Sequence, residues 1–402
     1  MEKIIIAGGG ISGLTARYYL SKKYPDADII LFEKSDRLGG CIDSCSYPFF
    51  FERGPRTFKA SRAEALLNLI DEVGLSDAIL YSDKQAARRF LWKGGKLRAL
   101  SPFSPLVFPL IPALLKEWRQ PYRRDEDETI ATFVARRLGN YAAEVFFDPL
   151  TLGIFAGSIH KLSISACFPE LKAMERDYGS ITRALVKKKR KKKRTGLFTL
   201  RGGLRTLVDR LVERGRGAIH LNTPLTTLDK EQRVILGVSS QGINGLFVKD
   251  RIAQEFLGPL ETKSLSVVNV AYSEDCLKKK GFGYLIPGSE REKILGAVFD
   301  SAIFPLQNRT NDETRLTVML RDGGIETALE GVRRHLGIES KPSAAYLKVW
   351  NDIIPQYGIG HLKRVRSFES YLKMHYPRLT CIGNYIDGVS LNHCVSLAAQ
   401  LI

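Results

Sequence analysis

The sequence is short of acidic residues, paired cysteines and long hydrophobic runs, and each shortage excludes a class of protein. Its six cysteines form no Cys-x-x-Cys pair and no spacing typical of a zinc site. We therefore expect no metal centre, and free thiols in a reducing compartment. The cysteines are Cys41, Cys45, Cys167, Cys276, Cys381 and Cys394.

An apolar segment, Leu106–Leu115, is interrupted by Pro109 and Pro112 and is too short to span a bilayer, which takes roughly twenty residues. Aromatic and cationic residues follow it as far as Arg124, an arrangement typical of an anchor at a membrane surface. A loop buried on its own domain is the alternative. Because the first expected strand begins at Lys3, we see no room for a secretory signal and expect a cytosolic location.

The chain has 43 acidic residues against 61 lysines and arginines, which gives a formal net charge of +18. Such an excess favours anionic partners, whether nucleic acid, acidic phospholipid or a polycarboxylate ligand. Part of it is the unbroken run Lys187–Arg194, which has no interleaved aromatic residues to stack on bases. We expect this run to be a solvated loop, either plain or touching anionic lipid, and we expect no nucleic-acid partner.

The most informative segment is the N-terminal one. A short apolar run from Lys3 leads into the pattern Gly8-x-Gly10-x-x-Gly13, and Glu33 follows Gly13 by 20 residues, after a second expected strand, Asp28–Phe32. Glycines in this order allow a tight turn, close approach of a phosphate and close packing of helix on strand, while the acid reaches ribose hydroxyls. The pattern predicts a dinucleotide site. Glycines that only shape a turn, and an NAD site, are the alternatives.

The residues after Glu33 favour FAD over NAD. The pattern Glu33-x-x-x-Arg37-x-Gly39-Gly40 resembles the extended fingerprint of FAD enzymes of the amine oxidase type. In such enzymes a guanidinium and further backbone N–H groups add to the pyrophosphate site at the helix N-terminus.

The rest of the chain predicts an α/β protein with discontinuous domains. We assign residues 1–60, 196–250 and 375–402 to a Rossmann-like FAD-binding domain. Residues 61–95 and 251–374 form a mixed-sheet α+β domain, and 96–195 form an inserted helical domain. In the second domain we expect strands at 260–272, 283–287, 294–299 and 315–320, and helices at 327–337 and 344–350.

A set of motifs spread along the whole chain resembles the protoporphyrinogen oxidase family. The motifs are Gly8–Gly13, Arg37–Gly40, Gly54–Arg56, Ala156-Gly157 with Lys161–Ser163, Leu200–Leu204, Gly281–Pro287, Phe304-Pro305, Ile354–Tyr357, Gly360-His361 and Gly383–Tyr385. The middle motifs are not shared by flavoproteins in general.

The resemblance implies an enzyme of heme biosynthesis that uses FAD to remove six electrons from protoporphyrinogen IX in three steps. Oxygen would be the acceptor and hydrogen peroxide the second product. Coproporphyrinogen III is an alternative substrate, while an amine oxidase or a carotenoid desaturase leaves the middle motifs unexplained. A nucleic-acid binder that uses the charged run Lys187–Arg194 is the alternative from a different class of protein. The resemblance also implies that the insertion binds a membrane surface through residues 101–124, peripherally on the cytoplasmic face, and it is compatible with a homodimer.

The residues expected to bind substrate are assigned from their match to positions of the family. Arg56 is expected to hold a propionate and is our candidate catalytic residue, with a surface salt bridge as its alternative role. Leu285 and Met319 correspond to positions that sandwich pyrrole rings, and Gly157 would let the backbone approach the macrocycle; all three could instead be ordinary core. The chemistry needs no histidine base, so we expect His160 and His361 to be structural.

Family positions also carry the cofactor assignments. Two departures from the family pattern, Asp387 and Leu362, lie near the expected flavin. The cofactor residues are Gly8, Gly9, Gly10, Ile11, Ser12, Gly13, Glu33, Arg37, Gly39, Gly40, Cys41, Gly54, Pro55, Thr57, Leu225, Leu362, Gly388, Val389 and Leu391.

Overall fold

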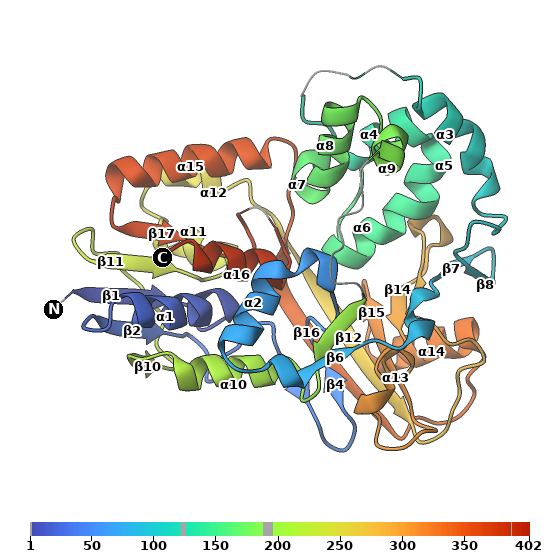
Figure 1. The fold of residues 1–402 in the computed structure, drawn as a ribbon, viewed down its shortest axis with the longest axis horizontal. Coiled ribbons are helices and arrows are strands. Elements are labelled where there is room, and N and C mark those ends of the chain that lie inside the picture. Colours follow the sequence, from blue (N-terminus) through green and yellow to red (C-terminus); the bar gives the residue numbers. More distant parts are fainter. Residues whose placement is uncertain (1, 121, 123–125, 188–195, 387) are drawn as a thin grey trace.

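A computed structural model describes residues 2–120, 122, 126–187, 196–386 and 388–402. It contains a parallel sheet layered between helices, a larger mixed sheet, and a group of helices that lies beside the larger sheet (Figure 1). The later part of the charged run, residues 188–194, lies outside the described residues, as does Asp387.

The parallel sheet has five strands in the order β10-β2-β1-β11-β17. Its central strands β1 and β11 are apolar and largely buried, because helices cover both sides of a parallel sheet. Ile4 and Ile6 pack on one side, under helices α1, α2, α10 and α16. Ile5 and Ala7 pack on the other side, under α11, α12 and α15. The strands are β1 (Lys3–Ala7), β2 (Asp28–Phe32), β10 (Ala218–His220), β11 (Arg233–Leu236) and β17 (Leu379–Cys381); the helices are α1 (Ile11–Lys23), α2 (Glu64–Glu72), α10 (Arg205–Arg214), α11 (Ser240–Leu246), α12 (Arg251–Leu257), α15 (His361–His375) and α16 (Leu391–Ala399).

The mixed sheet has seven strands in the order β16-β12-β15-β14-β13-β7-β8. One face is covered by α14 (Ile325–Leu336), whose Ala328 and Val332 pack on Leu316 and Val318. The opposite face is left for the site described below. The strands are β7 (Phe90–Lys93), β8 (Lys96–Ala99), β12 (Thr262–Tyr272), β13 (Gly283–Leu285), β14 (Ile294–Val298), β15 (Thr314–Leu320) and β16 (Ala344–Pro355).

Two expectations for this sheet differ from the structure. The helix expected at 344–350 is wrong, because these residues begin strand β16, which pairs along β12 from Ala271 to Thr262. Pairing with β12, together with β-branched and aromatic side chains that favour strands, decides the conformation here. A search for local helical periodicity detects neither the pairing nor this side-chain preference. Strand β8, which lies in the range assigned to the helical insertion, pairs with β7 and extends the sheet.

The helical group follows β8 and returns to the sheets through β9 (Leu197–Leu200). Its own core contains Ile130, Phe133 and Phe155. Of the helices in the described ranges, none is both long enough and apolar enough to cross a bilayer. The helices are α3 (Ile111–Glu117), α4 (Ile130–Leu138), α5 (Asn140–Ala142), α6 (Asp148–Phe155), α7 (Ile164–Cys167), α8 (Pro169–Tyr178) and α9 (Ile181–Lys187). The remaining short elements are β3 (Ser44–Cys45), β4 (Phe51–Glu52), β5 (Phe58–Lys59), β6 (Ile79–Tyr81) and α13 (Asp300–Ile303).

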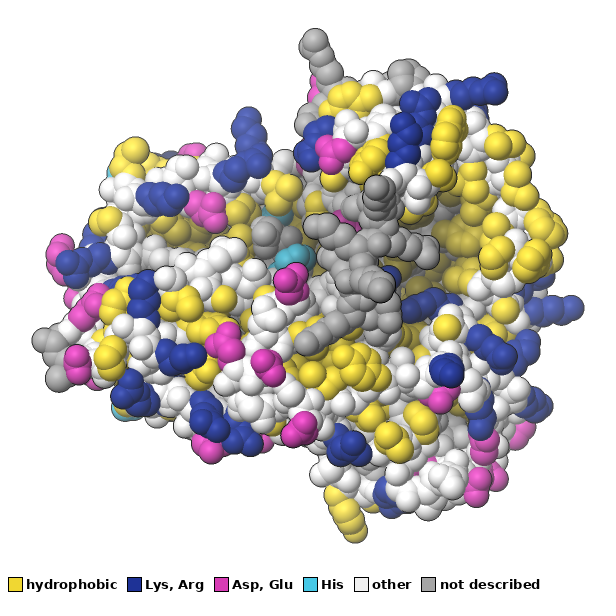
Figure 2. Space-filling model, in the orientation of Figure 1, with side chains coloured by type: hydrophobic (Ala, Val, Ile, Leu, Met, Phe, Trp, Pro, Cys, Tyr) yellow, Lys and Arg dark blue, Asp and Glu magenta, His cyan; other side chains and the backbone are white. Residues whose placement is uncertain are grey.

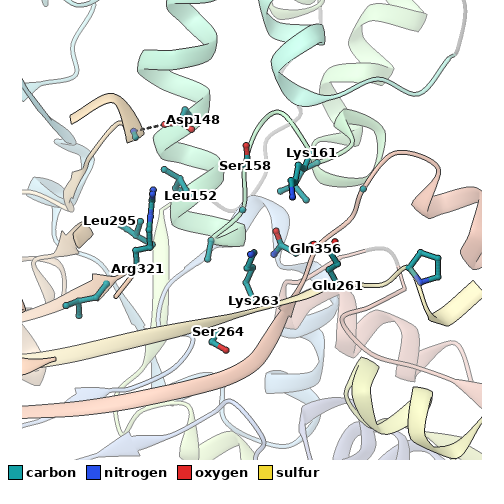
Figure 3. Close-up of a pocket in the computed structure, with 17 residues that line it drawn as sticks. Asp148, Leu152, Ser158, Lys161, Glu261, Lys263, Ser264, Leu295, Arg321 and Gln356 are labelled. Carbon is teal, nitrogen blue, oxygen red and sulfur yellow. Dashed lines mark hydrogen bonds between the residues drawn. The ribbon is translucent and has the colours of Figure 1, made fainter. Parts of the chain in front are cut away.

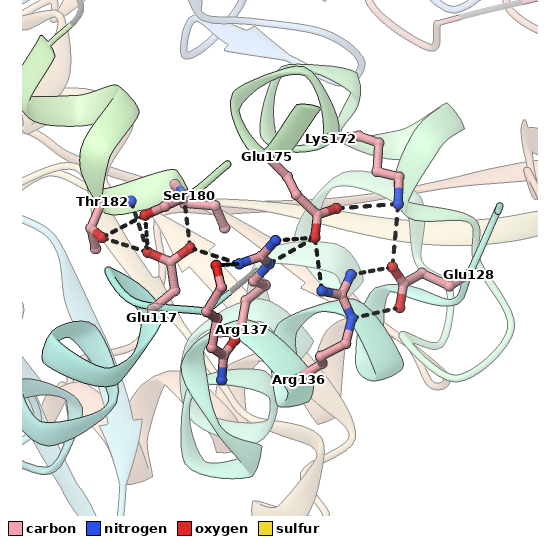
Figure 4. A network of polar contacts seen from close by, with 10 residues as sticks. Glu117, Glu128, Arg136, Arg137, Lys172, Glu175, Ser180 and Thr182 are labelled. Atoms are coloured by element: carbon pink, nitrogen blue, oxygen red, sulfur yellow. Dashed lines mark hydrogen bonds and ion pairs between the residues drawn. The ribbon is translucent and has the colours of Figure 1, made fainter. Parts of the chain in front are cut away.

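A buried ionic network joins these helices (Figure 4). Glu175 on α8 accepts hydrogen bonds from Arg137 Nε at 2.7 Å and from Arg136 at 2.7 Å. The side chains of Arg137 and Glu175 are fully buried. On the other side Arg137 lies 3.6 Å from Glu117, whose carboxylate also accepts the backbone N–H of Ile181 at 2.8 Å. Residues from α3, α4, α8 and α9 are thereby held together by charge.

The network also sets the ionisation of its carboxyl groups. Burial acts to raise the pKa of Glu175, but the hydrogen bonds from Arg136 and Arg137 outweigh it and hold the pKa below its ordinary value. For Glu117 burial is likewise opposed, here by the hydroxyl and backbone donors of Ser180, Ile181 and Thr182, and its pKa is also lowered. Groups of this kind stabilise the fold above the ordinary carboxyl pKa and lose that contribution as the pH falls through the lowered value.

Removing Arg137 therefore tests the network. Arg137→Met leaves two buried carboxylates without their shared cation, and we expect it to cost about 3–5 kcal/mol of unfolding free energy at neutral pH. Urea denaturation followed by tryptophan fluorescence measures this. The difference between wild type and variant should shrink as the pH is lowered below about 4. Lys280→Met, which breaks an exposed pair with Asp275, is the control and should cost less than about 1 kcal/mol; equal costs would contradict the prediction.

Candidate active site

The glycine-rich turn after β1 opens onto a cavity of about 340 Å³. A Cβ added at Gly13 would lie 1.9 Å from the carbonyl oxygen of Gly8, so only glycine lets α1 pack this closely on the strand. A Cβ at Gly10 would meet nothing of the described chain nearer than 4.0 Å and would project into open space. Gly10 lines the cavity together with Gly8, Ile11 and Ser12. The turn is therefore shaped both for packing and for a ligand.

Helix α1 presents its N-terminus to this cavity. Gly10 is the N-cap and contributes no side-chain hydrogen bond, and the first turn carries no acidic residue. The free N–H groups and the positive end of the helix dipole suit a pyrophosphate. At the end of β2, Glu33 accepts the Gly9 N–H at 2.6 Å and the Ser35 N–H at 2.8 Å, which fixes its carboxylate at the cavity wall. These residues fit a dinucleotide such as FAD.

Arg37 has a different position from the one expected. Its guanidinium donates to the carbonyl oxygens of Gly40 at 2.6 Å and of Ile42 at 3.1 Å, and it lies 5.9 Å from the Trp350 ring. It does not line the cavity in the described structure. Arg37 therefore acts on the site by holding the turn at Gly39 and Gly40, which do line the cavity.

The other assigned cofactor residues divide into two groups. Ile11, Ser12, Cys41, Pro55, Leu225, Val389 and Leu391 line the cavity. Gly9, Gly13, Gly54, Thr57, Leu362 and Gly388 do not. Gly54 packs against the Cys41 carbonyl and Leu362 packs in the core of the helical group, while the hydroxyl of Thr57 is buried without a hydrogen-bond partner in the described structure. An unsatisfied buried hydroxyl beside the cavity-lining Pro55 is consistent with a ligand there.

Sequence reasoning missed part of the wall. Residues 237–242 and 351–353 and Cys394 also line the cavity. A signal for the first of these was available, because strand β11 is followed by Gly237 and by Ser239, which caps α11 by accepting the Gly242 N–H. Residues 351–353 belong to β16, where the wrongly expected helix ended at Trp350.

Two substrate residues assigned from the sequence, Leu285 and Met319, lie on the face of the mixed sheet opposite α14. Leu285 pairs with Gly296, Gly296 with Met319, and Met319 with Val267, so these four residues form one row across the strands. Paired residues share a face. A Cβ at Gly296 would lie 2.2 Å from the carbonyl oxygen of Tyr284, so only glycine fits at this position of the row. A Cβ at Gly153 of α6 would lie 2.9 Å from Leu285, which places α6 directly beside the row.

Arg56 lies at the same face of the mixed sheet, near the part of β15 that contains Thr317. Its guanidinium is 3.3 Å from the carboxylate of Asp300, which accepts the hydroxyl of Thr317 at 2.6 Å. Thr317 precedes Met319 by two residues and so shares its face. Only 13% of the Arg56 side chain is exposed, so the arginine forms an ion pair, but a largely buried one and not the surface salt bridge considered above.

The neighbour of this pair is the buried carboxyl group of Glu52. Burial raises the pKa of Glu52 to about 7, against hydrogen bonds from the Leu204 N–H and the Ser44 hydroxyl that lower it. Burial thus disfavours the charged form of Glu52, and the carboxylate in contact with the Arg56 guanidinium is that of Asp300.

A larger cavity of about 780 Å³ lies between α6 and the mixed sheet (Figure 3). Gly157 lines it, as expected, but a Cβ there would lie 2.1 Å from the amide oxygen of Gln356. Gln356 is itself fixed, since it donates to the carbonyl oxygen of Phe155 at 2.8 Å. The small residue at 157 is therefore required by Gln356 and not by an open approach to the macrocycle. His361, by contrast, is buried beside Ile386 and Tyr357.

The open position at Gly10 gives a direct test of the cofactor cavity. Gly10→Val would place side-chain atoms where the dinucleotide must lie, and we expect the purified variant to lose at least about nine-tenths of its bound flavin while keeping its fold. The ratio of flavin to protein absorbance and the thermal unfolding midpoint measure the two effects. Gly245→Val, also at a position with open space around it but one that does not itself line the cavity, should keep its flavin; retention of flavin by both would argue against this site.

Comparison with known proteins identifies the family. The family model described as flavin containing amine oxidoreductase matches residues 11–396. The chain is 32% identical to protoporphyrinogen oxidase of Homo sapiens, with 99% of this chain and 97% of that protein covered. It is 27% identical to protoporphyrinogen oxidase of Schizosaccharomyces pombe, with 98% and 96% covered. The resemblance indicated by the sequence motifs is thus confirmed.

Solved structures agree on the fold. A structure named provisionally as a protoporphyrinogen oxidase, from Exiguobacterium sp. 255-15, superposes with a TM-score of 0.86 at 24% identity and covers 100% of this chain and 97% of its own. Reduced UDP-galactopyranose mutase superposes with a TM-score of 0.74 at 12% identity, covering 100% and 93%. The expected FAD-binding fold is confirmed. The chain belongs to the flavin-containing amine oxidoreductase family, and the protein is an FAD-dependent oxidoreductase.

Proposed function

We propose that the protein oxidises protoporphyrinogen IX to protoporphyrin IX, with coproporphyrinogen III as the alternative substrate. One observation carries the proposal. Pro55 lines the cofactor cavity, and the next residue, Arg56, pairs with Asp300, which accepts the hydroxyl of Thr317, two residues before Met319 on β15. A single turn thereby joins the flavin site to the apolar row of Leu285, Gly296, Met319 and Val267, which we call the platform, and a buried cation lies at its edge. This arrangement suits a flat apolar ring with acidic side chains.

The residues of this chain bind and orient the substrate in the proposed reaction. Leu285 and Met319 offer an apolar surface, and the thioether of Met319 adapts to a ring that is not fully planar. Arg56 exchanges its contact with Asp300 for a substrate carboxylate, which the guanidinium can hold with two hydrogen bonds. FAD held in the cofactor cavity would supply the hydride acceptor, with oxygen as the final electron acceptor and hydrogen peroxide as its product. Pyrrole protons can leave to water, so no side-chain base is required.

Anaerobic mixing of the purified protein with protoporphyrinogen IX tests the function. We expect the flavin absorption bands to bleach and porphyrin fluorescence to appear, and admission of oxygen to restore the flavin bands with release of hydrogen peroxide. A protein that keeps its flavin but shows no bleaching with either porphyrinogen would contradict the proposal.

Substitution of the buried arginine tests its role. Arg56→Ala should raise KM for the porphyrinogen by about 10- to 100-fold, because a hydrogen-bonded charge contact is lost, and should leave the bound flavin in place. Arg56→Ala also leaves the carboxylate of Asp300 without its cation. The double variant Arg56→Ala with Asp300→Asn is therefore measured alongside it and should show the same KM. Loss of flavin with unchanged KM would assign Arg56 to the cofactor instead.

We also propose that the protein attaches peripherally to the cytoplasmic face of a membrane through the helical group. The support is an exposed apolar surface around α3. Phe103 is 85% exposed, Leu115 is 69% exposed and Phe108 is 53% exposed. Hydrophobic side chains gather on this side of the molecule, at the right of Figure 2. Cations follow directly, with Lys116 at the end of α3 and Arg119 just beyond it, so the surface suits an anionic interface.

Vesicle sedimentation measures the attachment. The wild-type protein should bind vesicles that contain an anionic phospholipid, and the variant Phe103→Ser with Leu115→Ser should bind them at least about tenfold more weakly. Leu306→Ser removes a side chain that is 67% exposed but lies outside this surface, and it should bind as wild type does. Dimerisation through this surface without vesicle binding would assign it to a second copy of the chain.

A further inference from the structure

The larger cavity carries more positive charge than the proposed reaction needs. Three cations line it, Lys161 after α6, Lys263 near the start of β12, and Arg321 directly after β15. Figure 3 shows the three side chains around the same space. Across the described residues none of them forms an ion pair. Three cations without partners around one cavity indicate an anionic ligand.

The acidic residues of the cavity do not neutralise these cations. Asp148 and Glu261 also line the wall. Asp148 accepts the backbone N–H of Gly288 at 2.7 Å, so part of its hydrogen-bonding capacity is already used. Three positive groups against two negative ones leave an excess of one positive charge before any ligand arrives.

The cavity lies beyond the row of Leu285 and Met319 along β15, and neither of these two residues lines it in the described structure. Alternate residues of a strand share a face, so Thr317, Met319 and Arg321 follow one another along the open side of β15. The backbone N–H of Arg321 donates to the carbonyl of Lys293 at 3.0 Å, which continues the pairing toward β14 by one residue. At about 3.3 Å per residue, Thr317 and Arg321 are about 13 Å apart along the strand. Cations therefore stand at both ends of an apolar platform, Arg56 at the inner end and the three others at the outer end.

We propose that Lys161, Lys263 and Arg321 form a second carboxylate-binding site, which selects a porphyrinogen with acidic side chains on the edge away from Arg56. This inference rests on the proposed function, and it names the substrate feature that the site recognises. A carboxylate that reaches Arg56 has to displace Asp300, whereas a carboxylate that reaches the outer cations displaces only water. A porphyrinogen with four propionates can use both ends at once, and one with two propionates on neighbouring rings uses one end.

The test compares a tetracarboxylate and a dicarboxylate substrate. We expect Lys263→Gln and Arg321→Gln each to lower kcat/KM for coproporphyrinogen III by about tenfold, and to change kcat/KM for protoporphyrinogen IX by less than about threefold. Lys96→Gln removes one charge from the exposed edge strand β8 of the same sheet, and should change neither value. Flavin content and the unfolding midpoint should be unaltered in all three variants.

Equal losses on both substrates, or no loss on either, would overturn the second site. Equilibrium titration with the porphyrins coproporphyrin III and protoporphyrin IX, followed by fluorescence, gives a readout that does not need turnover. There the variants should weaken binding of the tetracarboxylate by about tenfold and spare the dicarboxylate; any other pattern refutes the proposal. A wild-type protein that binds the porphyrins selectively but oxidises neither porphyrinogen would refute the proposed function and leave the site standing.

Discussion

The contact between Arg56 and Asp300 is the one on which the site depends, because it ties the two sheets together where the chemistry must occur. Arg56 follows a residue that lines the cofactor cavity, and Asp300 begins α13 directly after β14 of the mixed sheet. The pair is largely buried, so breaking it without a replacement anion leaves a charge in a poorly solvated place. In the proposed function a substrate carboxylate is such a replacement, and the pair would be exchanged only for a ligand of negative charge.

Charged side chains are distributed unevenly over the molecule, and this distribution explains the properties of its separate parts better than the net charge of +18 does. Inside the helical group, cations and carboxylates alternate through Lys172, Glu175 and Arg137 and satisfy one another. In the larger cavity the cations outnumber the acids. A substrate that carries several carboxylates is drawn toward a cavity of that sign, and long-range attraction of this kind raises association rates at low ionic strength.

The sequence predicted strands β1 and β2 and the glycine turn between them closely, because the motif from Lys3 to Glu33 encodes strand, turn, helix and strand within a short stretch of chain, but it did not predict β11 in the interior of the sheet. Leu285 and Met319, which the family resemblance assigned to the two sides of pyrrole rings, lie in one row on one face of the mixed sheet. Contacts between distant segments were not accessible in the same way. The strand at Ala344–Pro355 depends on pairing with β12, the partner of Arg56 is 244 residues away along the chain, and the reason for Gly157 is Gln356.

The buried ionic network of the helical group has a consequence for how that group meets its surroundings. Most small helical domains bury apolar side chains and expose polar ones, so their packing changes when they enter a lipid environment. Here salt bridges and hydrogen bonds to Glu117 and Glu175 brace the middle of the group, while Phe103 and Leu115 already face outward. In the proposed membrane attachment, these exposed side chains would meet lipid while the buried network keeps its contacts.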